Sequence, residues 1–298
     1  MLIDSHIHIA RRELISEDIA SFLEQKGVWG EIEKMISPDG VVGALDQASV
    51  EKAVIFPLSF MPPDGIWQKL NEMTAEYIQL HPQRLIGFGI INPLDMGESL
   101  KEAERCVNDY NFLGFKVHPT MQKFYPNRED FSEFYAFCSD KRLPILFHTG
   151  ASLSNYADKY SHPSFLDEVA VRHPELKIIM AHMGRPYYQD AALLLRKHKN
   201  VYADICANEG RTGDPKLLEM VFSWLKIYAN GVEKLLFASD YPIFRPEKMH
   251  KYLEMLHVGK LIEGTDIPLV SDDEFESILH GNILKILELN LNTETSEE

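Results

Sequence analysis

Short apolar segments rich in β-branched residues alternate along the chain with longer amphipathic segments. The apolar segments predict β-strands at residues 2–9, 52–57, 85–91, 113–118, 144–148, 177–182, 200–205 and 234–240. The amphipathic segments predict helices, among them residues 68–80, 97–110, 130–139, 163–172, 189–198 and 215–228. Strands that alternate with helices are typical of right-handed βαβ units and a parallel sheet.

Eight strand–helix units favour a closed barrel over an open doubly wound sheet. Such a (β/α)8 TIM barrel, an α/β fold, commonly fills about 250 residues, and the chain has 298. We therefore expect a single domain over residues 1–289, followed by a disordered acidic tail at 290–298. The connection at residues 10–51 predicts an extra helix or a lid, and residues 272–289 predict a closing helix. No glycine-rich phosphate loop follows a predicted strand, which argues against dinucleotide binding.

The first predicted strand carries two histidines, His6 and His8, two residues apart. Because strand side chains alternate between the two faces of a sheet, both imidazoles point the same way. Two imidazoles on one face can each hold a cation at about 2.0–2.1 Å, which is half of a metal site. The alternative is that they satisfy hydrogen bonds near the end of the strand.

Four other predicted strands end in residues that can bind a metal or transfer a proton. They are Lys116 and His118 on the fourth strand, His148 on the fifth, His182 on the sixth and Asp240 on the eighth. In a barrel, the carboxyl ends of all strands lie on one face, and active sites are built there. Because charged groups are rarely buried without a partner, this gathering predicts an active site in the mouth of the barrel.

The motifs around these residues resemble those of a known family. They are the His-x-His of the first strand, Gly-Phe-Lys-Val-His-Pro around Lys116, Phe-His-Thr-Gly around His148, Ala-His-Met-Gly around His182 and Ser-Asp-Tyr-Pro around Asp240. In this order and spacing the chain resembles the amidohydrolase superfamily, in the branch that includes aminocarboxymuconate-semialdehyde decarboxylase and several lactone and ester hydrolases. The resemblance runs from His6 to Asp240 and implies a barrel enzyme with one divalent metal.

The resemblance implies that His6, His8, His148 and Asp240 hold this metal. Imidazole and carboxylate ligands suit Zn²⁺, with Mn²⁺, Fe²⁺ or Co²⁺ as alternatives. Asp240 is expected to accept a proton from a metal-activated water molecule, and His182 to transfer a proton during catalysis. Alternatively, Asp240 caps the segment after its strand, and His182 is a further ligand.

Lys116 decides between a site with one metal and a site with two. In binuclear relatives a carboxylated lysine at this position bridges the metals, but His118-Pro119 favours the mononuclear branch, with Lys116 as an ammonium that binds substrate together with His118. The resulting positive site favours a substrate that carries a carboxylate or develops an oxyanion. Arg185, on the loop after the sixth strand, is expected to add a carboxylate clamp or to be a surface charge. Asp4 is expected to orient the ligands.

These residues predict an enzyme of one of two reaction types. The main prediction is a metal-dependent hydrolase that uses metal-activated water on a small amide, ester or lactone, with a substrate that bears a carboxylate. The alternative is a non-oxidative decarboxylase of an unsaturated or aromatic acid, in which the same histidine protonates a substrate carbon. The ligand set is common to both reactions, so the sequence does not separate them. A second alternative is an inactive barrel that acts as a binding protein.

The composition of the chain limits the classes of binding partner and the cellular compartment that we expect. The net charge of −15 argues against nucleic acid or an anionic membrane, since both require a basic surface. The sequence contains no run of about 18 apolar residues, so we expect no membrane span. Three widely spaced cysteines, Cys106, Cys138 and Cys206, are typical of reduced packing residues in a cytoplasmic protein. We expect a small-molecule substrate as the partner, and the sequence leaves a homodimer open.

Overall fold

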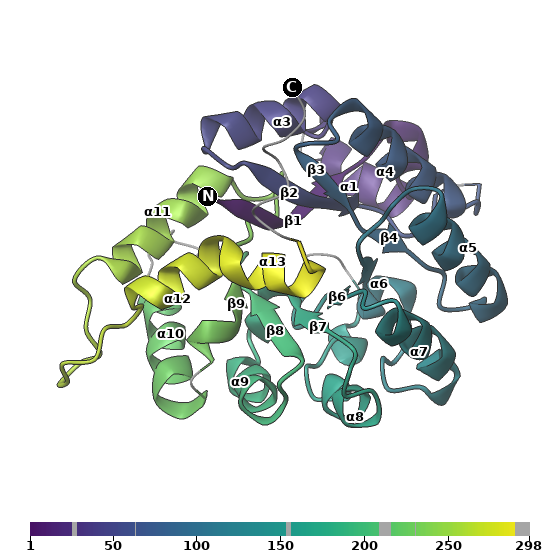
Figure 1. Ribbon diagram of the computed structural model, residues 1–298. Coiled ribbons are helices and arrows are strands. Elements are labelled where there is room, and N and C mark those ends of the chain that lie inside the picture. The colour runs from purple at the N-terminus through teal and green to yellow at the C-terminus, as the bar shows by residue number, and fades with distance from the viewer. Residues whose placement is uncertain (26–28, 63, 153–155, 209–215, 230, 290–298) are drawn as a thin grey trace, which may run out of the picture.

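The computed structural model describes residues 1–25, 29–62, 64–152, 156–208, 216–229 and 231–289. Within them, nine short parallel strands form two sheets (Figure 1). The strands are β1 (Ile3–Ile9), β2 (Lys52–Pro57), β3 (Leu85–Gly87), β4 (Gly89–Ile90), β5 (Phe115–Val117), β6 (Ile145–Phe147), β7 (Ile178–Met180), β8 (Val201–Asp204) and β9 (Leu235–Leu236). Strands β1 to β3 form one sheet in chain order, and β4 to β9 form the other. The tail predicted at residues 290–298 lies outside the described residues.

The two sheets are parts of one barrel. Strands β3 and β4 are halves of the strand predicted at residues 85–91, separated by Phe88, where hydrogen bonding passes from one neighbouring strand to the next. The backbone N of Phe88 donates to Ile55 O of β2 at 3.0 Å, whereas the backbone N of Gly89 donates to Gly114 O beside β5 at 2.9 Å. The predicted third strand is therefore continuous in its course but shared between the two sheets.

Backbone hydrogen bonds also close the gap between β1 and the segment that follows β9. The backbone N of Asp240 donates to His6 O at 3.0 Å, and that of His8 donates to Tyr241 O at 2.8 Å. The eight predicted strands thus form a closed ring, and the predicted (β/α)8 barrel is confirmed. Most strands are shorter than predicted. The strand predicted at residues 177–182, for example, is reduced to β7, because the backbone turns away before its last two residues.

Helices cover the outside of the barrel (Figure 1). They are α1 (Glu17–Gln25), α2 (Trp29–Met35), α3 (Pro38–Gln47), α4 (Gln68–Leu80), α5 (Met96–Asn108), α6 (Pro119–Gln122), α7 (Ser132–Asp140), α8 (Phe165–Arg172), α9 (Tyr188–Lys197), α10 (Lys216–Ala229), α11 (Pro246–His257), α12 (Asp272–Glu276) and α13 (Asn282–Leu287). The extra helix predicted at residues 10–51 is a set of helices, α1 to α3. A π-helical turn at Ser277–Gly281 divides the predicted closing helix into α12 and α13.

Over the described ranges, no helix combines the length and the apolar character needed to cross a membrane.

The amino-terminal end of the barrel is filled with apolar side chains. Inward-pointing residues such as Val54 and Leu236 pack with Ile283 and Ile286 of α13. Nζ of Lys177, at the start of β7, donates to Ile286 O at 2.7 Å and holds α13 across this end. The polar residues of the strands therefore gather at the opposite, carboxyl-terminal end, which is the face that carries active sites in such barrels.

Candidate metal centre

Two histidines of β1 and one aspartate after β9 meet in the barrel mouth. Nε2 of His8 lies 3.1 Å from Oδ1 of Asp240, and Nε2 of His6 lies 3.3 Å from the same oxygen. The two Nε2 atoms are 3.3 Å apart. All three side chains are buried, and Asp240 has a φ of 65°, a left-handed conformation that is uncommon for residues other than glycine. Backbone strain of this kind clusters at functional sites, and here it accompanies the convergence of three predicted metal ligands.

The protonation of these groups suits a divalent cation. Burial and the nearby charge of Lys116 hold the pKa of His6 well below its usual value, so its ring is neutral at pH 7. Burial raises the pKa of Asp240, but the hydrogen bond from His8 and the neighbouring His6 outweigh this effect and lower the pKa to about 2. Neutral imidazoles and an ionised carboxylate are donors that Zn²⁺, Mn²⁺ and related ions bind. These residues therefore fit a divalent metal.

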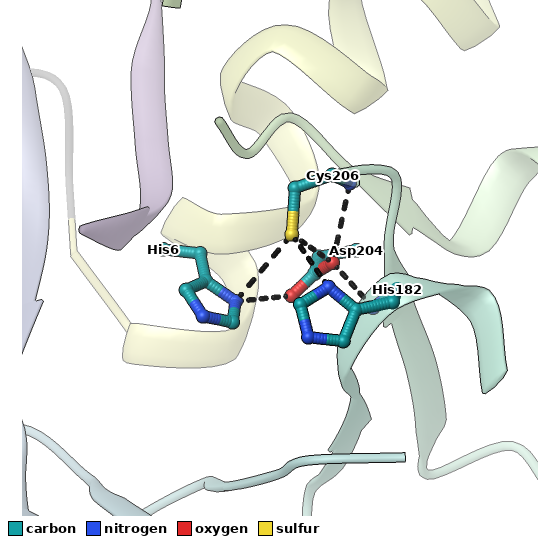
Figure 2. Close-up of side chains that lie close together, drawn as sticks. All are labelled: His6, His182, Asp204 and Cys206. Atoms are coloured by element: carbon teal, nitrogen blue, oxygen red, sulfur yellow. Dashed lines mark hydrogen bonds and ion pairs between the residues drawn. The ribbon is translucent and has the colours of Figure 1, made fainter. Parts of the chain in front are cut away.

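Asp204, the last residue of β8, is hydrogen-bonded to His6 and to neighbours of the candidate centre. Its Oδ2 accepts a hydrogen bond from Nδ1 of His6 at 2.8 Å, which leaves Nε2 of His6 free to face Asp240. Its Oδ1 accepts hydrogen bonds from the backbone N of His182 at 2.7 Å and from Sγ of Cys206 at 2.9 Å. Figure 2 shows these side chains facing one another. A carboxylate that fixes the ring of a metal-binding histidine is a common outer partner in metal sites.

Sequence reasoning misses both Asp204 and Cys206. Asp204 does carry a signal, because it is a charged residue near the end of the strand predicted at residues 200–205. Cys206 carries no such signal, since a lone buried cysteine usually serves packing. Its thiol is fully buried, and burial, together with the charge of Asp204, raises its pKa well above the usual value.

We expect Asp204→Asn to weaken metal binding about 10–100-fold, the usual cost of losing an outer partner of a metal-binding histidine. Asparagine keeps the shape of the side chain but removes the charge that fixes the ring of His6. Titration of the metal-free protein with Mn²⁺ measures the change. Asp167→Asn is the matched control, because Asp167 pairs with His198 at 2.6 Å in the outer helical layer. Equal metal affinity in the two variants would contradict this role of Asp204.

His148 and His182 lie beside the three converging donors. Nδ1 of His148 is 3.2 Å from Nε2 of His182, and burial lowers the pKa of both rings. Nε2 of His148 is buried and has no hydrogen-bond partner among the described residues, so it is free to bind a metal. Within the described part of the chain, the donor atoms of His6, His8 and Asp240 lie within 4.8 Å of one another, and His148 does not belong to that group. His148 as the fourth ligand therefore stays a prediction.

Lys116 points into the barrel from β5. Its neighbours Phe115 and Val117 belong to the outer apolar layer, and strand alternation therefore places Lys116 on the inner face. The side chain is 1% exposed, and its Nζ has no hydrogen-bond partner within the described ranges. Burial lowers its pKa to about 8, which leaves mostly ammonium at pH 7. Nζ does lie 5.0 Å from the centroid of the Phe56 ring, but an aromatic ring does not replace hydrogen bonds. A buried ammonium without a hydrogen-bond partner is costly, and this cost favours a role in binding an anion.

In contrast to Lys116, the two other residues predicted to bind substrate have hydrogen-bond partners. The ring of His118 stacks on that of His148, with centroids 3.7 Å apart. Its Nδ1 accepts a hydrogen bond from the backbone N of Met121 at 3.2 Å, so it caps α6 and leaves Nε2 as the protonated nitrogen. Arg185 is half-buried, and its Nη1 donates to the backbone O of Ala207, so it is not an isolated surface charge.

Asp4 is fully buried below the metal donors. Its Oδ1 accepts hydrogen bonds from the backbone N of His6 and the backbone N of Ser239, both at 3.0 Å. Asp4 therefore joins β1 to the segment that carries Asp240 and holds the backbone of both in register. Burial raises its pKa to about 7. Its role in orienting the ligands stays a prediction, and the contacts that would carry it are to the backbone.

Solved structures with similar folds include barrels of known and unknown activity. A TIM-barrel protein from Bordetella bronchiseptica has a TM-score of 0.74 at 16% identity, and the match covers 96% of this chain and 98% of that one. The dihydroxybenzoic acid decarboxylase of Polaromonas sp. JS666, solved with bound manganese and the inhibitor 2-nitroresorcinol, has a TM-score of 0.72 at 18% identity and covers 96% of both chains. At these identities the likeness shows the fold.

Curated relatives bear on the reaction type. Gamma-resorcylate decarboxylase of Rhizobium radiobacter is 25% identical over 218 residues, which are 59% of this chain and 65% of the relative. The match therefore spans less than two thirds of that protein. Because this relative is a decarboxylase, the main prediction of a hydrolase is wrong. The physical reason is that the same metal donors serve both reactions, so the donors alone do not select one.

The family itself is shown by a match over nearly the whole chain. A family model described as amidohydrolase matches residues 3–289. This span contains every residue of the candidate metal centre, from Asp4 to Asp240. The match confirms the resemblance that the motifs at the strand ends indicate. The chain therefore belongs to the amidohydrolase family.

Proposed function

We propose that this protein is a metal-dependent, non-oxidative decarboxylase of a small aromatic acid. The observation that carries the proposal is the buried ammonium of Lys116, which has no hydrogen-bond partner among the described residues and lies close enough to His6 to lower its pKa. A cation beside a metal site suits a substrate with two anionic oxygen groups, such as a hydroxybenzoate. The decarboxylases of Rhizobium radiobacter and Polaromonas support the reaction type.

In this reaction a proton replaces the carboxylate on a ring carbon. His182 delivers the proton from Nε2 to that carbon, the bond between the ring and the carboxylate breaks, and its electron pair returns to the ring as CO₂ leaves. Burial lowers the pKa of His182, so its protonated form is a strong proton donor. Lys116 holds an anionic oxygen of the substrate and so fixes the ring beside His182.

We assign the metal to His6, His8, His148 and Asp240, as the motifs predict. When bound, a divalent ion would act as a Lewis acid that attracts and orients the oxygens of the acid. Manganese is the first candidate, because the Polaromonas decarboxylase holds it. Zinc, the first choice from the sequence, has no such support, and like iron and cobalt it is an alternative that the same donors accept.

The test of the proposal is CO₂ release by the purified, Mn²⁺-loaded protein from a panel of hydroxybenzoic acids. In D₂O, the ring carbon that loses CO₂ should gain deuterium in equal amount, because the proton that replaces the carboxylate comes from an exchangeable group. Proton NMR of the product measures this incorporation. Failure of every acid in the panel to lose CO₂, with the metal bound, would refute the proposed reaction.

Lys116→Met is expected to raise KM for the acid about 10–100-fold and to leave the metal content unchanged. This range corresponds to the loss of a hydrogen bond to a charged group. Methionine keeps the length of the side chain and removes its charge. Steady-state kinetics and elemental analysis measure the two quantities. Lys101→Met is the control, since Lys101 is an exposed lysine on α5. Loss of metal from the Lys116 variant would instead indicate a carboxylated lysine that binds two metals.

The pH dependence of KM is a second readout for the same variant. Burial lowers the pKa of Lys116 to about 8, so the side chain is charged below this pH and neutral above it. Attraction to an anionic substrate is therefore present at lower pH and is lost as the pH rises through this value. KM of the unchanged protein should rise across this range, and KM of Lys116→Met should not. Parallel profiles for the two proteins would contradict the assignment.

A further inference from the structure

The thiol of Cys206 is fully buried between Asp204 and the ring of His182 (Figure 2). Sγ lies 2.9 Å from Oδ1 of Asp204 and 3.1 Å from Nδ1 of His182. We propose that Cys206 is a positioning residue that keeps a proton on Nδ1 of His182 and so makes Nε2 the nitrogen that exchanges a proton with the substrate. This inference rests on the proposed function of His182 as the proton-transfer group.

The direction of the first hydrogen bond follows from Asp204. The backbone N atoms of His182 and Cys206 donate to its Oδ1, at 2.7 and 3.3 Å. Nδ1 of His6 donates to its Oδ2 at 2.8 Å. Both oxygens of this carboxylate therefore act as acceptors. The hydrogen between Oδ1 and Sγ must then come from the thiol.

The direction of the second hydrogen bond follows from the first. A thiol has a single hydrogen, and in Cys206 it is given to Asp204. Sγ can therefore only accept from His182, so Nδ1 of His182 carries a hydrogen and donates it. In the neutral ring the other nitrogen, Nε2, is left with a lone pair that can take up a proton.

The same chain of hydrogen-bond donors and acceptors extends to His148. Its Nδ1 lies 3.2 Å from Nε2 of His182, which in the neutral ring can only accept. Nδ1 of His148 therefore donates, and Nε2 of His148, which has no partner among the described residues, keeps its lone pair. One thiol thus sets the protonation of two histidines, one that transfers a proton and one that is available to a metal.

Loss of the thiol would remove the acceptor that holds this arrangement. Without Sγ, the hydrogen of His182 can move from Nδ1 to Nε2, and in that form Nε2 cannot take up the proton that it must deliver. A serine hydroxyl can donate once to Asp204 and accept from His182, as the thiol does, whereas alanine can do neither. The two substitutions at Cys206 therefore separate hydrogen bonding from packing.

The experiment compares Cys206→Ala, Cys206→Ser and Cys138→Ala, each purified in full length with Mn²⁺. Cys138 is the matched control, because it is an equally buried cysteine on α7. We expect Cys206→Ala to lower kcat roughly tenfold, which corresponds to the loss of one orienting hydrogen bond. The pH profile of kcat should shift, whereas KM and the metal content should not change. Serine should restore most of kcat, and Cys138→Ala should match the unchanged protein. A Cys206→Ala variant with unchanged kcat and pH profile, or a serine variant no better than alanine, would overturn the inference.

Nitrogen NMR of the histidine rings needs no substrate and separates this inference from the proposed function. In Zn²⁺-loaded protein with ¹⁵N-labelled histidine, the ring signals report which nitrogen of His182 carries a hydrogen, and His182→Asn identifies these signals. We expect Nδ1–H in the unchanged protein and in Cys206→Ser. A hydrogen on Nε2 in the unchanged protein would overturn the inference even if CO₂ is released. The expected NMR result without CO₂ release would refute the proposed function alone.

The competing role for Cys206 is that of a metal ligand. Its Sγ and the donor atoms of His6, His182 and Asp204 lie within 4.8 Å of one another. Cobalt distinguishes the two roles, because a thiolate bound to Co²⁺ gives an intense charge-transfer absorption in the near ultraviolet. We expect no such absorption in the Co²⁺-loaded protein. An absorption that disappears in Cys206→Ala would overturn the positioning role.

Discussion

Removal of the metal ion is expected to abolish CO₂ release from the aromatic acid, and Mn²⁺ added back is expected to restore it. His6, His8 and Asp240 place their donor atoms 3.1–3.3 Å apart in a buried mouth, a set that suits one divalent ion. Without this ion the oxygens of the acid have no Lewis acid to hold them beside His182. Dialysis against a chelator, elemental analysis and the CO₂ assay measure the loss and the recovery.

The same experiment tests the number of metals. We expect full activity at one equivalent of metal per chain, and His8→Ala should lose both metal and activity. His198→Ala is the control for metal content, because His198 is a buried histidine that pairs with Asp167 in the outer helical layer. A second tightly bound equivalent, or CO₂ release by protein shown to be free of metal, would contradict a mononuclear metal-dependent reaction.

The sequence predicts the barrel and most of its polar mouth because both depend on short-range rules. Alternation along a strand places Lys116 inward between Phe115 and Val117, and it places His6 and His8 on one face. Chain order then brings the carboxyl ends of all parallel strands to one end of the barrel. These inferences require the pattern of apolar residues and no knowledge of how the side chains pack.

The contacts of Asp204 do not follow from such rules. It meets His6, which lies 198 positions away in the sequence, and it also binds the backbone of His182, where φ turns to 59° after β7. Neither contact depends on a local pattern, so only the folded chain reveals the link through Cys206. The reaction type is hidden for a different reason, since one donor set serves hydrolysis and decarboxylation alike.

Replacement of His182 by asparagine is expected to lower kcat about 10²–10⁴-fold, the range that a proton-transfer group contributes. An amide does not take up or release a proton near neutral pH. Asparagine tolerates the φ of 59° at this position and keeps the backbone N–H that donates to Asp204 at 2.7 Å, so the metal centre should persist. The rate of CO₂ release and the metal content of the purified variant check both expectations.

His173→Asn is the matched control, because His173 ends α8 ahead of β7, whereas His182 follows β7 on the side of the barrel mouth. We expect kcat of the control to equal that of the unchanged protein. A large fall in kcat for His182→Asn at constant KM would separate proton transfer from substrate binding, since a binding residue acts on KM as well. If the variant instead lost its metal together with its activity, His182 would be a metal ligand.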